Sequence, residues 1–365
     1  MEINLAVLGR QFELHQAEYE QAALRALRSG WYVLGHEVEN FEKEFAEYLG
    51  ARFCVGVNSG LDALTLTVRA LNIGEGDEVI VQANTYIATV LAITENKATP
   101  IFVEPNEFYN IDAEKIESAI TPKTKAIMVV HLYGQATNMK KICAVAEKYN
   151  LPIIEDCAQS HGAKFDGKMT GTFGVGCFSF YPTKNLGAFG DGGAVGTNDE
   201  NFAQKIKMLR NYGSKIKYHN EIEGVNSRLD EIQAALLRTK LSHLDELNEE
   251  RKKIAARYLN EIKNPKIILP KIREDCEHVW HQFVIRAKNR DDFQKYLEQN
   301  KIKTVIHYPI PPHLADCYKY LNHRCGDFPT AEKFADEVLS LPMFNGMTAE
   351  EISFVVDVIN NYQEK

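Results

Sequence analysis

The chain has 365 residues, 45% of them hydrophobic and 25% charged, which is enough to bury a large core and to form two domains. Its formal net charge of -8 at pH 7, without any block of lysine and arginine, argues against nucleic acid or an anionic membrane as a partner, since both require a concentrated basic surface. The start of the sequence lacks the features of a secretory signal, and no apolar run approaches the roughly 18 residues that span a bilayer, so we expect a cytoplasmic protein.

From residue 53 to residue 199, short apolar runs alternate with amphipathic stretches of helical length, a pattern typical of a mostly parallel sheet covered by helices, an α/β fold. The predicted strands are Phe53–Val57, Glu78–Gln82, Thr99–Val103, Lys125–His131, Pro152–Glu155, Cys177–Tyr181 and Gly193–Thr197. The predicted helices among them are Asp62–Leu71, Ile87–Glu95, Ala113–Ile120 and Met139–Tyr149. In such sheets ligands bind in the loops after the carboxyl ends of the strands, where we expect the chemistry. These loops are residues 58–62, 84–86, 156–161 and 182–184.

A long stretch with apolar residues at helical spacing, residues 227–263, is expected to link this region to a smaller α+β unit. The elements predicted in that unit are the strands Trp280–Arg286 and Lys303–Ile306 and the helices Asp291–Asn300 and Ala349–Tyr362. A proline-rich loop, His307–His313, lies between them. We therefore predict a large domain over residues 1–245, including the N-terminal segment, and a small C-terminal α+β domain over residues 246–365.

Lys184 is the first candidate for chemistry. It follows an apolar, aromatic strand in S-F-Y-P-T-K and precedes the glycine-rich G-A-F-G-D-G-G. Burial at such a position lowers the pKa of a lysine and frees its amine to condense with an aldehyde. An isolated lysine in a loop would instead be an ordinary surface residue, but the apolar context here favours the functional interpretation.

Asp156 is the second candidate, at the end of the aliphatic run in I-I-E-D-C-A-Q-S-H. A carboxylate buried there requires a cation, and a protonated pyridine ring is one that also serves as an electron sink. The alternatives are a helix cap or an arginine partner. The neighbouring Glu155 is expected to point to the other face of the sheet.

The third candidate is N-S-G at residues 58–60, between a predicted strand and a predicted helix. The backbone N–H groups of Gly60 and Leu61 would there cradle a phosphate at the helix N-terminus, and the hydroxyl of Ser179 would join them. The competing interpretation is a helix capped by Ser59 with no ligand.

The remaining sequence features argue against a P-loop, a metal site and a disulfide framework. Gly162–Lys168 approximates a P-loop, but Met169 replaces the required hydroxyl and a D-G hairpin turn explains the sequence better. No G-x-G-x-x-G motif is present, and His278 with His281 lacks the further ligands of a zinc site, so we expect no metal. The seven cysteines include no C-x-x-C pair and predict no disulfide framework.

Taken in order, the motifs N-S-G, N-T-Y-I-A-T, E-D-C-A-Q-S-H-G-A, S-F-Y-P-T-K-N-L-G-A-F-G-D-G-G, R-N-Y-G-S, G-V-N-S-R-L-D-E-I-Q-A and H-Y-P-I-P-P-H resemble the DegT/StrS family of nucleotide-sugar aminotransferases. The resemblance runs from about residue 30 to the C-terminus. It implies the aspartate-aminotransferase fold (fold type I), with a mostly parallel seven-stranded sheet. It also implies a homodimer with shared active sites and pyridoxal 5'-phosphate (PLP) as cofactor, which passes through pyridoxamine 5'-phosphate during the reaction.

The resemblance also implies roles for individual residues. Lys184 would hold PLP as a Schiff base and move protons, and Asp156 would pair with the pyridine nitrogen. The other implied cofactor contacts are Gln159 and Tyr86 at the ring, Ser59, Gly60, Leu61 and Ser179 at the phosphate, and Asn226 reaching the phosphate of the neighbouring subunit. The implied sugar contacts are His161, Tyr181, His307 and Tyr308. Many relatives have threonine where this chain has Leu61, so backbone donors and Ser179 would have to replace a lost hydroxyl contact.

The implied reaction transfers the amino group of L-glutamate to a nucleotide-linked keto sugar, and the motifs favour a dTDP-3-keto-6-deoxyhexose. Amination at C4 of a dTDP-, UDP- or GDP-linked sugar is the alternative, and a regulatory protein without turnover is an alternative of another class. A sugar dehydratase of the same family would have histidine in place of Lys184. An amino-acid aminotransferase would need an arginine for the substrate carboxylate, for which Arg210 and Arg228 are the candidates.

Overall fold

In the computed structural model, which describes residues 1–363, the larger part of the molecule is built on a seven-stranded sheet of order β1-β9-β8-β5-β4-β2-β3. The strands are β1 Phe53–Val57, β2 Glu78–Gln82, β3 Thr99–Val103, β4 Thr124–Val130, β5 Ile153–Asp156, β8 Val175–Ser179 and β9 Gly193–Thr197. Only β9 runs antiparallel to its two neighbours, whereas the other pairs are parallel. The predicted α/β fold with seven strands is confirmed.

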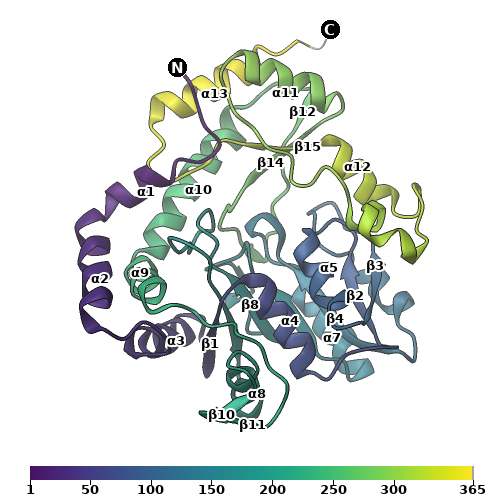
Figure 1. The fold of residues 1–365 in the computed structure, drawn as a ribbon. Helices are drawn as coiled ribbons and strands as arrows, with labels where there is room; N and C mark the ends of the chain where they lie inside the picture. Colours follow the sequence, from purple (N-terminus) through teal and green to yellow (C-terminus); the bar gives the residue numbers. More distant parts are fainter. Residues whose placement is uncertain (364–365) are drawn as a thin grey trace.

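Helices cover both faces of this sheet (Figure 1). They are α4 Gly60–Ala70, α5 Ile87–Thr94, α6 Ala113–Ile116, the 3₁₀ turn Glu117–Ala119, α7 Met139–Tyr149 and α8 Glu200–Leu209. Val79 and Val81 of β2 point into one core, which contains α4, α5 and α8, while Ile80 points into the opposite core, which contains α6 and α7. This alternation is the period of two that a strand imposes, and it explains why both faces are apolar.

Three N-terminal helices that the sequence pattern did not predict precede the sheet: α1 Leu8–Leu14, α2 Gln16–Ser29 and α3 His36–Leu49. The helices α2 and α3 pack against α9 Glu231–Ser242. The helical stretch predicted over residues 227–263 is therefore two helices, since the backbone at His243 leaves the helical region before α10 Leu244–Glu261 begins.

The C-terminal unit contains a three-stranded antiparallel sheet of order β12-β14-β15. Its elements are β12 Ile267–Ile268, β14 Phe283–Ala287, α11 Arg290–Gln299, the 3₁₀ turns Pro312–Leu314 and Asp316–Leu321, α12 Pro329–Glu337, β15 Val338–Leu341 and α13 Ala349–Asn360. The strand predicted at Lys303–Ile306 is reduced to one bridge between Val305 and Ser340.

The N-terminal segment differs from the prediction that placed it in the large domain. Ile3 forms a parallel bridge with Ile302, and Ile3 and Val7 pack in the hydrophobic core of the C-terminal unit. The chain thus begins on the small unit and crosses to the large one through α1 and α2. The junction of α9 and α10 at His243 lies close to the boundary predicted at residue 245.

Two small sheets complete the structure. The D-G turn at Asp166 and Gly167 joins β6 Lys164–Phe165 to β7 Lys168–Met169, and β13 Cys276–Glu277 extends this hairpin. Both turn residues have positive φ, so the hairpin interpretation of this segment is confirmed. The second sheet is the pair β10 Ser214–Ile216 and β11 His219–Asn220. Among the described helices, none has the length and apolar character needed to cross a membrane.

Candidate active site

A cavity of about 670 Å³ lies at the carboxyl ends of the central strands. Its walls come from the loops after β1, β2, β5 and β8, which are the four loops in which the sequence predicts chemistry. Two further segments, both from the C-terminal unit, close it on the other side. The predicted residues on its wall are Ser59, Gly60, Leu61, Tyr86, Asp156, Gln159, Ser179, Tyr181, Lys184, His307 and Tyr308.

Lys184 lies in a tight turn after β8, where its backbone N–H donates to the carbonyl of Tyr181 over 2.8 Å. Burial lowers the pKa of Lys184 to about 8, and the negative charge of Asp156 only partly opposes this shift. A larger fraction of the amine is therefore neutral near pH 7 than for a free lysine, and the neutral amine is the nucleophile that condenses with an aldehyde.

Asp156 is 5% exposed at the end of β5. Its carboxylate accepts hydrogen bonds from the Thr89 hydroxyl over 2.7 Å and from the Ala158 backbone N–H over 3.1 Å. Burial raises its pKa, and within residues 1–363 no cation hydrogen-bonds to it. A buried carboxylate with only neutral donors fits a ligand that brings a cation, as a protonated pyridine ring does.

Glu155, the rival acid, points to the other face of the sheet as expected. Its carboxylate accepts hydrogen bonds from the backbone N–H groups of Gly171, Phe173 and Gly174 over 2.7–2.8 Å and bonds to His131 over 3.0 Å. These four partners satisfy it, so it holds a loop in place and does not face the cavity.

The N-terminus of α4 has the geometry of a phosphate cradle. The Ser59 hydroxyl accepts from the backbone N–H of Asp62 over 3.1 Å, while the N–H groups of Gly60 and Leu61 have no acceptor within the described chain. A Cβ atom on Gly60 would lie 2.5 Å from the Cβ of Ser179, so only glycine lets the helix approach β8 this closely. Free amides at a helix N-terminus beside a hydroxyl suit a phosphate.

Gln159 and Tyr86 line the same cavity as Lys184 and Asp156. The Gln159 side chain accepts from the Tyr133 backbone N–H over 2.6 Å and donates to the Tyr308 hydroxyl over 3.0 Å, which fixes its orientation. The Tyr86 ring is 51% exposed and lies 5.1 Å from that of Tyr308. Its free face is available for stacking on a flat ligand.

The outer wall carries neutral polar groups. Tyr181 is 53% exposed, and His307 bonds to the Ser340 hydroxyl over 2.8 Å and to Gln282 over 3.0 Å. Burial lowers the pKa of His307 to about 4, so its ring is neutral at physiological pH. Because its groups are uncharged, this wall suits a ligand with hydroxyl groups, such as a sugar, better than a ligand with a charged group.

His161 does not take the place expected for it. Its ring is fully buried between Phe178 and Phe180, with centroid distances of 5.8 Å to each, and neither ring nitrogen has a hydrogen-bond partner within the described chain. Burial lowers its pKa to about 3. The residue packs behind the site, so we no longer expect it to touch the sugar.

Asn226 is exposed and lies outside the cavity of its own chain, where its backbone bridges to Asn211. Its predicted contact with the phosphate of a neighbouring subunit requires such an exposed position and stays a prediction.

The cavity wall also contains residues that the sequence analysis did not single out, notably Thr85, Thr183, Asp191, His281 and Gln282. His281 and Gln282 come from the small unit, about 100 residues beyond Lys184 in the sequence, so no local motif connects them to the site. The sequence singles out His281 only together with His278, as a pair that lacks the further ligands of a zinc site.

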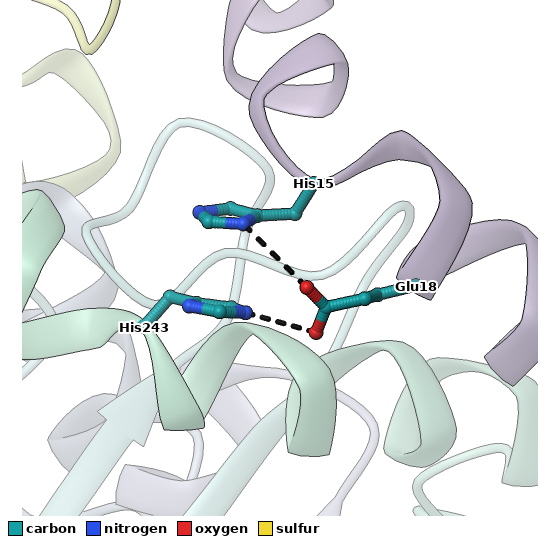
Figure 2. Close-up of side chains that lie close together, drawn as sticks. All are labelled: His15, Glu18 and His243. Atoms are coloured by element: carbon teal, nitrogen blue, oxygen red, sulfur yellow. Dashed lines mark hydrogen bonds and ion pairs between the residues drawn. The ribbon is translucent and has the colours of Figure 1, made fainter.

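Among the described residues, two clusters bring together side chains of types that can bind a metal ion. In the first, the rings of His15 and His243 stack 3.6 Å apart at 11°, and Glu18 lies beside both, 3.0 Å from His243 and 3.9 Å from His15 (Figure 2). A bound ion lies near the plane of each ligating ring, which two nearly parallel rings cannot both satisfy. The contacts are therefore those of a hydrogen-bonded junction between the N-terminal helices and the α9–α10 corner.

The second cluster, His131, Glu155 and Cys157, is completely buried. Its carboxylate is the one already satisfied by four donors, and burial raises the pKa of the Cys157 thiol. A thiol that resists ionisation is a poor ligand, so this cluster is explained as part of the core.

A buried lysine with a lowered pKa, a buried aspartate without a cationic partner in the described chain and free amides at a helix N-terminus meet in one cavity of a mostly parallel sheet, an arrangement that fits the PLP enzymes of fold type I. A family model described as the DegT/DnrJ/EryC1/StrS aminotransferase family matches residues 14–360. The chain belongs to this family, and the resemblance drawn from its motifs is confirmed.

Three similar proteins are informative. The chain is 56% identical over 350 residues, 95% of this chain and 96% of the other, to a dTDP-3-amino-3,6-dideoxy-alpha-D-galactopyranose transaminase of Aneurinibacillus thermoaerophilus. The crystal structure of DesV from S. venezuelae in complex with a ketimine intermediate superposes with a TM-score of 0.96 at 46% identity, covering 98% of both chains. That of NtdA from Bacillus subtilis with bound cofactor PMP gives a TM-score of 0.90 at 32% identity, covering 97% of this chain and 83% of that one.

Proposed function

We propose that this protein transfers an amino group from L-glutamate to a dTDP-3-keto-6-deoxyhexose and releases a dTDP-3-amino-3,6-dideoxyhexose. The observation that carries the proposal is that Lys184 and Asp156 face one cavity whose outer wall holds neutral hydrogen-bonding groups. The transaminase name of the relative from A. thermoaerophilus supports position C3 and a galacto-configured acceptor.

Each residue has a defined task in this proposal. PLP, when bound, supplies the electron sink that lets a proton leave carbon. The Nζ atom of Lys184 accepts that proton and returns it on the acceptor side, because its lowered pKa suits both directions near neutral pH. Asp156 keeps the ring nitrogen protonated, and the amides of Gly60 and Leu61 hold the phosphate.

The sugar contacts are proposed from the geometry of the outer wall. Tyr181, His307 and Tyr308 line the cavity. Ser340 and Gln282 hold the ring of His307, and Gln159 holds the hydroxyl of Tyr308. Because the hydroxyl and imidazole groups are neutral, they bind a deoxyhexose without requiring a counter-charge.

We propose that the enzyme acts as a homodimer, in which Asn226 of each chain completes the site of the other. We also place it in the cytoplasm, where the reducing environment suits its seven unpaired cysteines.

The test follows the visible absorbance of purified, PLP-loaded protein. Glutamate should bleach the cofactor band, and dTDP-3-keto-6-deoxygalactose should restore it with formation of a product identified by mass and by NMR at C3. The Lys184→Ala variant should show neither change. A dTDP-4-keto-6-deoxyhexose that restores the band, while the 3-keto sugar does not, would move the reaction to C4. Absence of any response to glutamate in the wild-type protein would reject the transaminase and leave the regulatory alternative.

A further inference from the structure

A second cavity, of about 270 Å³, adjoins the cofactor cavity. Five residues line both cavities: Tyr181, Thr183, His281, Gln282 and His307. The remaining wall comes from the N-terminal residues 5–8, Gln11, Arg251 of α10 and part of the small unit. The volume is several times the roughly 30 Å³ that one water takes in the liquid, which leaves room for a small ligand group.

Arg251 is 5% exposed, and within residues 1–363 no carboxylate forms an ion pair with it. Its Nε atom donates to the Asn345 side chain over 3.2 Å, and its Nη1 atom donates to the carbonyls of Trp280, His281 and Met343 over 3.2, 3.3 and 3.5 Å. Within residues 1–363 its Nη2 atom has no hydrogen-bond partner. The adjacent Glu250 carboxylate instead accepts from the Asn345 side chain over 2.7 Å and the Gly346 backbone over 2.8 Å.

Lys240 brings a second buried basic group to the same region. It is 3% exposed, and among the described residues its Nζ atom donates to the Gln11 side chain over 3.0 Å and to the Gly187 carbonyl over 3.1 Å. Burial, together with the charge of Arg251, lowers the pKa of Lys240 to about 7. Gln11 in turn lines the cavity. A buried guanidinium with neutral partners is costly to a fold, and an anion that enters beside it relieves this cost and favours the charged form of Lys240.

The cofactor cavity itself lacks such a cation. Among the described residues on its wall, Lys184 is the single lysine or arginine. Arg210 is bound to Glu42 over 2.5 Å and to the Gly56 carbonyl, and Arg228 lies over the Tyr212 ring, so the two arginines considered from the sequence do not reach this cavity. Within one chain, a counter-charge for the carboxylates of the amino donor therefore has to come from outside this cavity, and the adjoining cavity contains Arg251.

We propose that the cavity at Arg251 binds a carboxylate of the dicarboxylic amino donor. Arg251 supplies the guanidinium, and Gln11, backed by Lys240, supplies a polarised amide. His281 lines both cavities, and its carbonyl accepts a hydrogen bond from Arg251 over 3.3 Å, so it connects this anion subsite to the cavity of the reacting lysine. The inference rests on the proposed transaminase activity for the identity of the donor, but the anion subsite is testable by itself.

The experiment measures binding of glutarate, a dicarboxylate without an amino group, to PLP-loaded protein by isothermal titration calorimetry. Gln11→Glu keeps the shape of the side chain and places an internal carboxylate beside Lys240 and Arg251, so glutarate affinity should fall at least about tenfold. Arg251→Lys keeps the charge but loses the planar fork, and should also weaken binding about tenfold. Gln299→Glu adds the same charge on the exposed surface of α11 and should leave affinity unchanged.

Thermal unfolding separates this role from a structural one. Gln11→Glu should keep or raise the melting temperature, since Lys240 gains a partner. The inference is wrong if Arg251→Lys lowers the melting temperature while both variants keep the wild-type affinity for glutarate. In that case Arg251 only stabilises the contact between α10 and the small unit. Wild-type protein that reacts with glutamate yet fails to bind glutarate also rejects this subsite and leaves the proposed function standing. Glutarate binding that Gln11→Glu abolishes supports the subsite even if the sugar acceptor is another.

Discussion

Lys184 and Asp156 share one cavity, yet burial acts on their charges in opposite senses. It lowers the pKa of the lysine and raises that of the aspartate, so both groups are pushed toward their neutral forms. A ligand that carries a cationic ring nitrogen and an aldehyde relieves both penalties together. The burial of these two side chains therefore favours the binding of PLP.

The pH dependence of cofactor loading follows from Lys184. Only its neutral amine condenses with the aldehyde, and the pKa of about 8 means that about half of the amine is neutral at pH 8 and nearly all of it one to two pH units higher. Apo-protein mixed with PLP at pH 6.5 to 10 should therefore show a rate of absorbance change that rises steeply below pH 8, is half-maximal near pH 8 and levels off between about pH 9 and pH 10. A rate that still climbs steeply at pH 10 would show that the lysine is not desolvated.

Asp156→Asn tests the second member of the pair. The amide keeps an acceptor for Thr89 or Ala158 but can no longer hold a proton on a ring nitrogen, so kcat should fall on the order of 10²-fold or more. Stopped-flow absorbance after mixing with glutamate measures this loss. Thr89→Ser, which keeps the hydroxyl, is the matched control and should stay near wild type.

At the scale of elements, the site depends on how closely α4 approaches β8. A Cβ on Gly60 would meet the Ser179 side chain at 2.5 Å and push the helix away from the strand. Overpacking of this kind costs about 1–3 kcal/mol, so Gly60→Ala should weaken PLP binding about tenfold or more, as measured by fluorescence titration. Gly9→Ala, where a Cβ meets nothing within 4 Å, should bind PLP normally.

The C-terminal helix α13 begins with a complete capping box. The Thr348 hydroxyl accepts from the backbone N–H of Glu351 over 3.2 Å, and the Glu351 carboxylate accepts from the backbone N–H of Thr348 over 2.9 Å. Loss of the cap in Thr348→Ala should lower the free energy of unfolding in urea by about 1 kcal/mol. Thr348→Ser keeps the cap, and an equal loss in that variant would mean that the methyl group, not the hydroxyl, stabilises the helix.

The elements of the central sheet could be predicted because each strand carries a compact apolar run and each loop a turn signal. Four strands, among them Phe53–Val57 and Gly193–Thr197, have the predicted bounds. The sequence around His243 carries no glycine or proline that would mark the break between α9 and α10, and the stacking of its ring on that of His15 joins segments more than 200 residues apart. The places of His281 and Arg251 could not be predicted for a similar reason, since only the folded chain brings His281 to the cavity of Lys184 and Arg251 to the adjoining cavity.

At the scale of the whole molecule, the proposed sharing of Asn226 between subunits predicts complementation. The protein should elute with twice the 41.3 kDa mass of one chain. Lys184→Ala and Asn226→Ala homodimers should each have strongly reduced activity. Equal amounts unfolded and refolded together should regain about one quarter of wild-type activity, because half of the dimers are mixed and each has one intact site. No recovery on mixing would mean that Asn226 serves its own chain or none.

The path of the N-terminal segment has a mechanical consequence. Residues 1–7 pack on the small unit, and α2, which follows them, packs against the large unit. The chain therefore crosses between the two units twice, once through the N-terminal segment and once through α10. A single hinge permits rotation about many axes, whereas two tethers leave little freedom except rotation about the line that joins them. Any rotation of the small unit relative to the large one should therefore be restricted in direction by residues 1–7 as well as by α10.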